Sequence, residues 1–517
     1  MARPGFVLEV DDRTPPLVVP AGDAFRLERF PLGTRVVYPA ESLPPVEDVS
    51  EAIDSALDRP IDSEPLAALL RPGMALTIAF DDISTPLPRM QRPDIRGRII
   101  EAVLTRAARA GVDDVALVAA RGLGRRMSET ELRQVLGERI FRSFYADGLL
   151  TAHDAEDTEQ LSVVFTDGGQ DLTLNARAAA SDLLVFVHIT SGGDRDGVRA
   201  VARGLGSAAT ISRLSVQPDH EAPGPDSASV ETLVGRVGDA LPIFQVEAVL
   251  DNAATSGPLE FLGKREWEWN LKDQAAWLAV RRGLGVTTRK ARTRLLNRAT
   301  SDYAPIQLLA GAPAAVAAAS SAKAIEQRAV EVHGQSDVAV LGVPHLTPYS
   351  VDSITNPVLA AWSALGSAFR AHTGQPVVRP DGALIVYHPM PVEFSPLHHP
   401  SYVDFFADVL PTTTDAVQIQ DKFESRYASD PWYTHLYSSS FAFHGIHPFH
   451  VWYEMAAARA HCGDIIFVGA HRPTIERLGF RAASTLADAL EIVSSSVGRS
   501  PSITFLHGAP QLVADVR

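Results

Sequence analysis

A repeated succession of strand, loop and helix constrains the fold of this chain more than any other feature. Apolar runs at 75–80, 114–120 and 183–187 each stop abruptly at polar or glycine-rich residues, and helical spacing follows the first two. Strands that alternate with helices predict a parallel sheet between helical layers. The carboxyl ends of parallel strands share one edge, so we expect the three loops that follow these strands to converge on one crevice.

The second half repeats this pattern with a histidine after each apolar run. Four such runs lead into His345, His388, His471 and His507. If these strands are parallel, their carboxyl ends bring several imidazoles to one rim. A further group, His444-Gly-Ile-His447-Pro-Phe-His450, precedes a predicted helix at 451–461. We interpret these histidines as a second wall of the site, as proton-transfer groups or metal ligands; the alternative is that they are ordinary strand-end and loop residues.

A chain of 517 residues is too long for one hydrophobic core. We predict an α/β fold of two α/β domains with mainly parallel sheets and an interdomain crevice. The expected boundaries are an N-terminal domain over 1–275, a helical linker region over 276–330 and a C-terminal domain over 331–517. The linker rests on helical spacing at 273–300 and on the Ala-rich stretch 308–322.

Composition narrows the range of partners. A net charge of −15 argues against nucleic acid and anionic membranes. No uncharged apolar run is long enough to span a membrane, and the N-terminus does not resemble a signal peptide, so we expect a cytoplasmic protein. The single cysteine, Cys462, excludes an internal disulfide and a multi-cysteine metal site. A small anionic substrate is the expected partner.

The run 183–187 ends at His188, which we predict to be a catalytic acid or base. The glycine-rich turn behind it can bring backbone N–H groups close to an anion. The anion-binding residues expected there are Ser191, Gly192, Gly193, Arg195 and Arg199. The alternative is a strand cap, an ordinary turn and solvated arginines.

The two other loops complete the predicted site. Ser128 and Glu131 match a capping box, so the basic loop 121–126 leads into a helix N-terminus, which suits a carboxylate or phosphate. We expect His345 to supply the second catalytic group and assign no metal ligand. The substrate-binding residues expected from the first two loops are Asp82, Ser84, Thr85, Gly122, Gly124 and Arg125.

The order of these motifs resembles the LarA-like proteins, the nickel-dependent lactate racemase family. The family's Asp-x-Thr-Arg-Pro, Gly-Thr-His-Arg, Thr-x-x-Glu-Leu and His-Asp segments are similar to segments of this chain, and its Gly-Gly-Arg-Lys segment corresponds to the stretch that begins at Gly197. The matching segments here are Asp82-Ile-Ser-Thr-Pro86, Gly122-Leu-Gly-Arg125, Ser128-Glu-Thr-Glu-Leu132 and His153-Asp154. The resemblance implies two α/β domains around a nickel-pincer nucleotide, which takes up a hydride transiently while α-hydroxy acids interconvert.

The chain departs from the family at the positions that hold this cofactor. Arg199 stands where the resemblance places the attachment lysine, and a guanidinium cannot form that link. Ser215 replaces the nickel-binding histidine, Gly124 a catalytic histidine and Thr85 a phosphate-contacting arginine, whereas His188 is kept. We therefore expect no covalent cofactor, with a nickel-pincer nucleotide possible only in a noncovalent, rearranged form.

These observations favour a racemase- or epimerase-like isomerase acting on a small α-hydroxy acid or sugar acid. A lyase or dehydratase could use the same bases. A non-catalytic ligand-binding or sensor protein is the alternative from a different class, because the missing cofactor positions fit it equally well.

Overall fold

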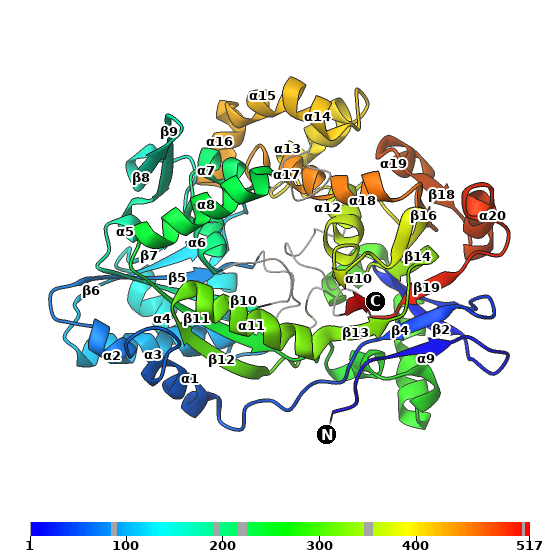
Figure 1. Ribbon diagram of the computed structural model, residues 1–517, viewed down its shortest axis with the longest axis horizontal. Helices are drawn as coiled ribbons and strands as arrows, with labels where there is room; N and C mark the ends of the chain where they lie inside the picture. Colours follow the sequence, from blue (N-terminus) through cyan, green and yellow to red (C-terminus); the bar gives the residue numbers. More distant parts are fainter. Residues whose placement is uncertain are drawn as a thin grey trace.

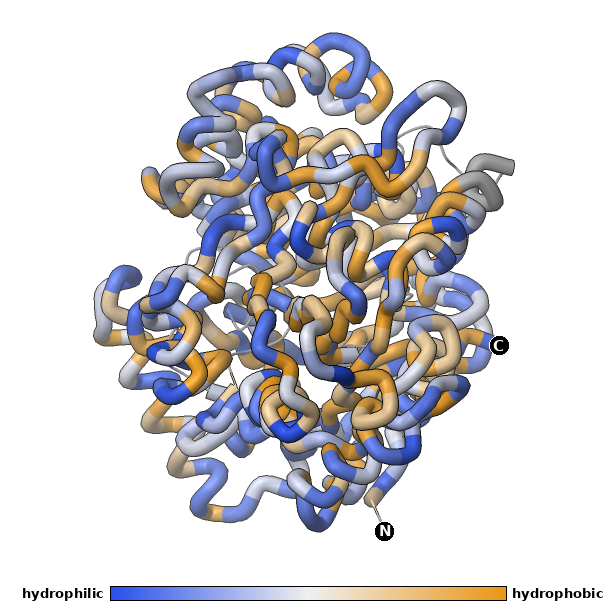
Figure 2. Tube along the Cα trace, turned by 90° about the vertical axis from the view of Figure 1, so that its left-hand side faces the viewer, coloured by the Kyte–Doolittle hydropathy of each residue, from blue (hydrophilic) through white to orange (hydrophobic). Residues whose placement is uncertain are grey.

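Two largely parallel sheets organise the part of the chain that the structure describes. This computed structural model describes residues 2–83, 90–190, 197–215, 225–296, 298, 300–345, 355–508 and 512–517, without the side chains of 225–229. Each sheet with its flanking helices forms one lobe, and the lobes lie side by side (Figure 1). Hydrophobic segments gather toward the interior, while many outer turns are hydrophilic (Figure 2).

The first lobe is built on a six-stranded sheet with helices on both faces. Its central strands are nearly continuous apolar runs, as expected for strands covered on both sides. All neighbours are parallel except β11 and β12. The order across the sheet is β12 (Pro305–Gly311), β11 (Ile243–Leu250), β10 (Leu183–Thr190), β5 (Ala75–Asp81), β6 (Asp114–Ala120) and β7 (Leu150–Ala152).

Two apolar clusters hold the helices of the first lobe against opposite faces of this sheet. One cluster packs beneath α1 (Val49–Asp58), α2 (Leu66–Leu69), α3 (Ile95–Arg109) and α4 (Glu129–Tyr145). The opposite face carries α5 (Ala176–Ala179), α6 (Gly197–Leu205), α7 (Ala208–Leu214), α8 (Pro225–Ala240) and α11 (Pro313–Arg328), with the hairpin of β8 (Leu161–Asp167) and β9 (Gln170–Asn175) beside them.

The second lobe is built on a seven-stranded sheet, parallel except for the pair β1–β4. Its order is β1 (Phe6–Glu9), β4 (Arg35–Tyr38), β19 (Ile503–Leu506), β14 (Ser336–Gly342), β16 (Val378–Tyr387), β17 (Asp464–Val468) and β18 (Arg481–Ala483). A small parallel sheet joins β13 (Ala329–Val332), β20 (Val513–Val516) and β15 (His372–Gly374).

The two faces of the second sheet are also covered. One face packs on α20 (Leu486–Val497) and the hairpin of β2 (Leu17–Ala21) and β3 (Ala24–Glu28). The other face packs on a larger helical layer, which contains α12 (Pro357–Trp362), α13 (Pro400–Asp404), α14 (Ala416–Ile419), α15 (Ser425–Ala428), α16 (Pro431–Ser439), α17 (His447–Glu454), α18 (Ala456–His461) and α19 (Arg472–Arg477).

The structure confirms the predicted α/β class with mainly parallel sheets, but sheet membership departs from the expected boundaries. Strands β1 and β4 lie in the expected N-terminal domain, yet they hydrogen-bond into the second sheet. Conversely, β12 lies in the expected linker region but extends the first sheet. Strand pairing between residues hundreds of positions apart cannot be seen in local composition. A division of the sequence into consecutive domains therefore assigns β1, β4 and β12 to the wrong sheets.

The expected helical linker needs correction in two places. The helical region 273–300 is α9 (Leu271–Val286) and α10 (Arg289–Leu296), separated at Thr287 and Thr288. The Ala-rich stretch begins inside β12, and α11 starts only at Pro313, a residue that suits the first turn of a helix. Short apolar runs fit a strand and a helix equally well, which explains the error. No helix in the described ranges is long and apolar enough to cross a membrane.

Candidate active site at the carboxyl edge of the first sheet

The three loops singled out in the sequence leave one edge of the first sheet. Strand β5 lies between β10 and β6, and all three are parallel. Phe80 pairs with Val187, and Asp81 pairs with Ala120, so the loops begin side by side. Ser84, Thr85, Ser191, Gly192, Gly193 and Arg195 lie outside the described residues, and their predicted roles stay predictions.

An aspartate–histidine pair occupies this edge. His188 is 4% exposed, and its Nδ1 lies 2.6 Å from Asp81 Oδ2. The same Asp81 oxygen accepts a hydrogen bond of 2.9 Å from the backbone N–H of Ile189. Burial by itself would raise the pKa of Asp81, but the charge and hydrogen bond of His188 outweigh it, so the pKa is lowered. The pair is thus poised as an ionised carboxylate that orients an imidazole.

Sequence reasoning chose Asp82 and missed Asp81. Both aspartates follow the apolar part of β5, and the side chain of Asp81 reaches His188. The Asp82 side chain is buried, and its backbone carbonyl accepts a hydrogen bond of 2.8 Å from Arg96. The register of β5 against β10 could have identified Asp81, because this register places the Asp81 side chain on the same sheet face as His188.

Close packing shapes the glycines of loop 121–126. Gly122 has a φ of +48°, and a Cβ there would lie 2.3 Å from the carbonyl oxygen of Arg203. A Cβ at Gly124 would lie 2.7 Å from the carbonyl oxygen of Arg121. The loop in this conformation therefore accepts no side chain at 124, the position that matches a catalytic histidine of the resembled family.

Two arginines expected to bind substrate already carry carboxylate partners. Arg125 is buried and forms a bidentate pair with Glu131, at 3.0 Å and 2.6 Å. Glu131 is also the third residue of the predicted capping box with Ser128, which the structure contains. Arg199, on α6, forms an ion pair with Glu231 on α8. Their predicted roles in substrate binding remain untested predictions.

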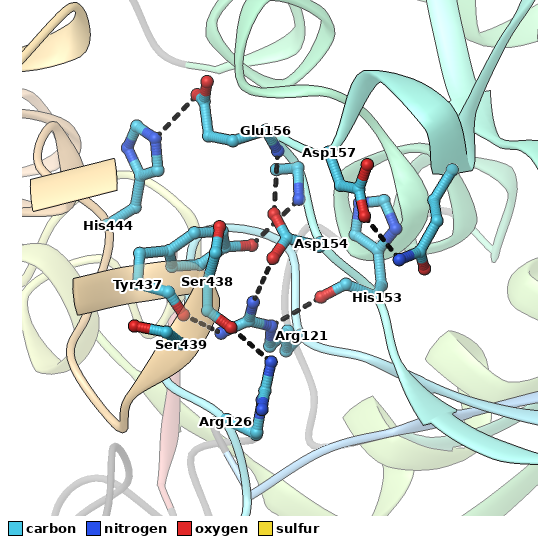
Figure 3. A network of polar contacts seen from close by, with 12 residues as sticks. Arg121, Arg126, His153, Asp154, Glu156, Asp157, Tyr437, Ser438, Ser439 and His444 are labelled. Atoms are coloured by element: carbon cyan, nitrogen blue, oxygen red, sulfur yellow. Dashed lines mark hydrogen bonds and ion pairs between the residues drawn. The ribbon is translucent and has the colours of Figure 1, made fainter. Parts of the chain in front are cut away.

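The second lobe meets the first through α16 and the segment that follows it (Figure 3). The hydroxyl of Tyr437 donates to the carbonyl oxygen of Gly122 at 2.6 Å, and the Arg121 guanidinium lies 3.8 Å from the centre of its ring. His444 Nε2 lies 2.8 Å from Oε1 of the Glu156 carboxylate, and the backbone N–H of His444 donates to the carbonyl oxygen of Leu123. Sequence reasoning noted the histidine cluster but not Tyr437.

The four strand-end histidines have different surroundings. Their strands, β14, β16, β17 and β19, are parallel, so the prediction that they leave one edge is confirmed. His345 and His388 lie near enough for the charge of the first to lower the pKa of the second, and burial is the main cause of that lowered pKa. His507 pairs instead with Glu266 at 2.8 Å. Across the described ranges, no three His, Cys, Asp or Glu side chains gather in a metal-binding arrangement.

One family model and two solved structures are similar to this chain. Residues 28–215 match the family model of the lactate racemase N-terminal domain. The structure is similar to the lactate racemase apoprotein from Thermoanaerobacterium thermosaccharolyticum, with a TM-score of 0.63 and 15% identity, over 97% of this chain and 100% of that one. A Thermotoga maritima protein solved in a structural genomics programme gives a TM-score of 0.47 and 11% identity, over 91% and 98%. No curated protein matches the chain.

The fold and this sheet edge define a two-lobed α/β protein whose first lobe contains a lactate racemase N-terminal domain. The match over residues 28–215 agrees with the resemblance of the sequence motifs to the LarA-like proteins.

Proposed function

We propose that the chain is a racemase- or epimerase-like isomerase that acts on a small α-hydroxy acid or sugar acid bound between the lobes. The observation that carries this proposal is the buried Asp81–His188 pair, at the carboxyl edge of a lactate racemase N-terminal domain. Ligands of open α/β sheets bind outside this edge. The match to the lactate racemase apoprotein over almost the whole chain supports the same class of reaction.

The chemistry of the pair follows from its geometry. Asp81 holds Nδ1 of His188 at 2.6 Å, which orients the ring. Proton exchange with the substrate then falls to Nε2. The α-hydrogen of a simple hydroxy acid is weakly acidic, so the reaction needs a substrate with a more acidic C–H bond or a diffusible cofactor that accepts a hydride.

We also propose that the chain does not carry the covalent nickel-pincer nucleotide. The guanidinium of Arg199, at the position of the attachment lysine, pairs with Glu231, and guanidinium does not form the link. The hydroxyl of Ser215, at the position of the nickel ligand, donates to the carbonyl oxygen of Ile211 at 2.7 Å. The residues present therefore do not fit the covalent group, and a noncovalent nickel-pincer nucleotide is the alternative to test.

The first experiment measures exchange of the substrate α-hydrogen with deuterated solvent by NMR, over a panel of α-hydroxy and sugar acids. We expect exchange by the wild type and at least a hundredfold slower exchange by His188→Asn, because general acid–base groups contribute about 10²–10⁴-fold. His435→Asn, at an exposed position on α16, is the matched control and should exchange at the wild-type rate.

Four results would contradict these proposals. Binding of an acid with neither solvent exchange nor inversion at the α-carbon would favour the sensor alternative, because a hydride held by a cofactor does not exchange with solvent. Loss of water from the substrate would favour a dehydratase. Equal exchange rates for the wild type and His188→Asn would remove His188 from the reaction. Stoichiometric nickel in the purified protein, measured by mass spectrometry of the metal content, would contradict the proposed loss of the cofactor.

A further inference from the structure

A buried arginine outside the predicted site has no bonded partner in the described part of the chain. Arg328 is the last residue of α11 and is 3% exposed, and its Nε is enclosed without a hydrogen-bond acceptor. Arg96 shows the usual arrangement of a buried guanidinium, since it pairs with Asp94 at 2.8 Å and binds two backbone carbonyls. A buried charge without such partners is strongly unfavourable, so the guanidinium of Arg328 needs a hydrogen-bond acceptor.

Helix α11 carries Arg328 to the same edge of the sheet as His188. Eight residues of a helix rise about 12 Å, and four residues of a strand rise about 13 Å. When a helix runs along a strand, a step of eight helix residues therefore matches a step of four strand residues. The contacts between α11 and β11 follow this spacing. Ser320 donates a hydrogen bond to Glu247, and Ala324 packs with Val249. Farther along both elements, the charge of Asp251 acts on Arg328. Glu247 pairs with His188 in register, so Arg328 lies on the same sheet face, farther out along the strand direction.

The acidic neighbour of Arg328 is engaged with the backbone. Asp251 Oδ1 accepts hydrogen bonds from the N–H groups of Ala253, at 3.1 Å, and Ala304, at 3.3 Å. It organises the two segments that follow β11 and precede β12, and it does not bond the guanidinium. Its charge favours the protonated form of Arg328 without occupying its donors.

Arg328 also stands where the chain crosses between the lobes. The preceding residue, Gln327, accepts from the N–H of Leu43 at 2.7 Å and donates to the carbonyl oxygen of Glu41 at 3.0 Å. The following residue, Ala329, begins β13 of the small sheet. Two crossing segments are thus tied together beside the guanidinium, and Figure 1 shows α11 leading into β13 between the two halves.

We propose that Arg328 binds an oxyanion, a carboxylate or phosphate group, of the small ligand held between the lobes. The planar guanidinium offers paired donors that match either group. This inference rests on the proposed function for the identity of the ligand and adds an anchor that the sequence motifs did not contain. His188 then acts at one end of the ligand, and Arg328 holds an anionic group at the other.

The test compares thermal unfolding of the wild type and Arg328→Met with sodium phosphate, sodium lactate or sodium chloride at equal ionic strength. We expect phosphate or lactate to raise the Tm of the wild type above its value in chloride. In Arg328→Met we expect the apparent affinity for that anion to fall about tenfold or more. Stabilisation by phosphate would identify a phosphate site, and stabilisation by lactate a carboxylate site.

Controls separate this proposal from a structural role and from the proposed function. Arg459→Met removes a guanidinium that donates to the carbonyl oxygen of Leu478 at 3.1 Å in the second lobe, so it should lower the Tm but keep the full anion response. His188→Asn should lose exchange and keep the anion response. A wild type that responds to neither anion, or an Arg328→Met variant that responds like the wild type, would overturn the assignment of Arg328 and leave the role of His188 standing.

Discussion

Glu266 is a buried carboxylate that joins three distant segments. It accepts hydrogen bonds from the backbone N–H of Val18 at 2.8 Å and the hydroxyl of Tyr38 at 3.0 Å, and it pairs with His507 at 2.8 Å. Burial by itself would raise the pKa of Glu266, but His507 and the other donors outweigh it, so the pKa is lowered. The ionised form therefore stabilises the fold above the ordinary value of 4.5, and this contribution is lost as the pH falls through the lowered pKa.

Replacement of Glu266 should make this contribution measurable. We expect Glu266→Gln to lower the free energy of unfolding by about 1–3 kcal/mol at pH 7, because buried donors lose a charged acceptor. The difference should shrink as the pH falls below 4.5 and through the lowered pKa, where the carboxylate of the folded wild type also becomes neutral. Urea unfolding at pH 7 and pH 4 checks this, and Glu268→Gln, at a partly exposed ion pair with Arg3, should change stability by less than about 1 kcal/mol. A difference that does not depend on pH would contradict the role of the charge.

Single residues also show what the sequence could and could not predict. His188 was predicted because an apolar run leads into it, although the strand continues to Thr190, and Glu131 was predicted because it belongs to a capping box. Asp81 and Arg328 were missed for the same reason. Their roles depend on which side chains the folded sheet and helix bring near them, and these neighbours lie far away in the sequence.

At the scale of elements, α16 is one of the contacts between the second lobe and the loops of the first. The Tyr437 hydroxyl accepts from the N–H of Ala155 at 3.1 Å and donates to the carbonyl oxygen of Gly122 at 2.6 Å. One side chain thus fixes the loops that follow β6 and β7. The arrangement positions the glycines of loop 121–126 from outside their own lobe.

Removal of this hydroxyl should loosen both loops. We expect Tyr437→Phe to lower the free energy of unfolding by about 1–3 kcal/mol, since two buried backbone groups lose their partner. Hydrogen exchange at 121–126 and 153–156 should become faster. Tyr433→Phe, whose hydroxyl bonds Asp404 within the second lobe, is the matched control and should leave exchange in these loops unchanged. Equal exchange in wild type and Tyr437→Phe would show that α16 does not hold the loops.

The order of helices and strands along the chain was largely predictable from the sequence, but the pairing of distant strands in the sheets was not. Apolar runs that stop at glycine, histidine or other polar residues marked β5, β6, β10, β14 and β19, because a strand buried on both faces needs such a run. The antiparallel edge strand β12 was absorbed into a predicted helical linker. An Ala-rich segment carries no periodicity that separates the end of a strand from the start of a helix.

Across the whole molecule, buried histidines make stability depend on pH. Burial lowers the pKa to about 4 for His153 and His345, and to about 3 for His388, His399 and His447. In the unfolded chain these imidazoles take up protons near pH 6.5, so unfolding binds protons below that value. The stabilisation is present in full above about pH 6.5 and is lost progressively as the pH falls.

We expect the free energy of unfolding to fall steeply between pH 6.5 and 5. Each of these histidines contributes up to about 1.4 kcal/mol per pH unit. Urea unfolding at pH 7.5, 6.5 and 5.5 measures the slope, and His153→Asn should reduce it by the contribution of one proton. A stability that is constant over this range would mean that the imidazoles are solvated or charged in the folded protein.

The exchange of strands between the lobes has a consequence for synthesis. Strand β4 pairs with β19, and Arg35 is 469 residues away from its hydrogen-bonded neighbour Thr504. When the chain leaves the ribosome, β4 must wait for the synthesis of the long segment that separates it from β19 before its partner exists. The six-stranded sheet can assemble in the meantime, so the last piece to emerge closes a sheet whose first piece emerged at the start.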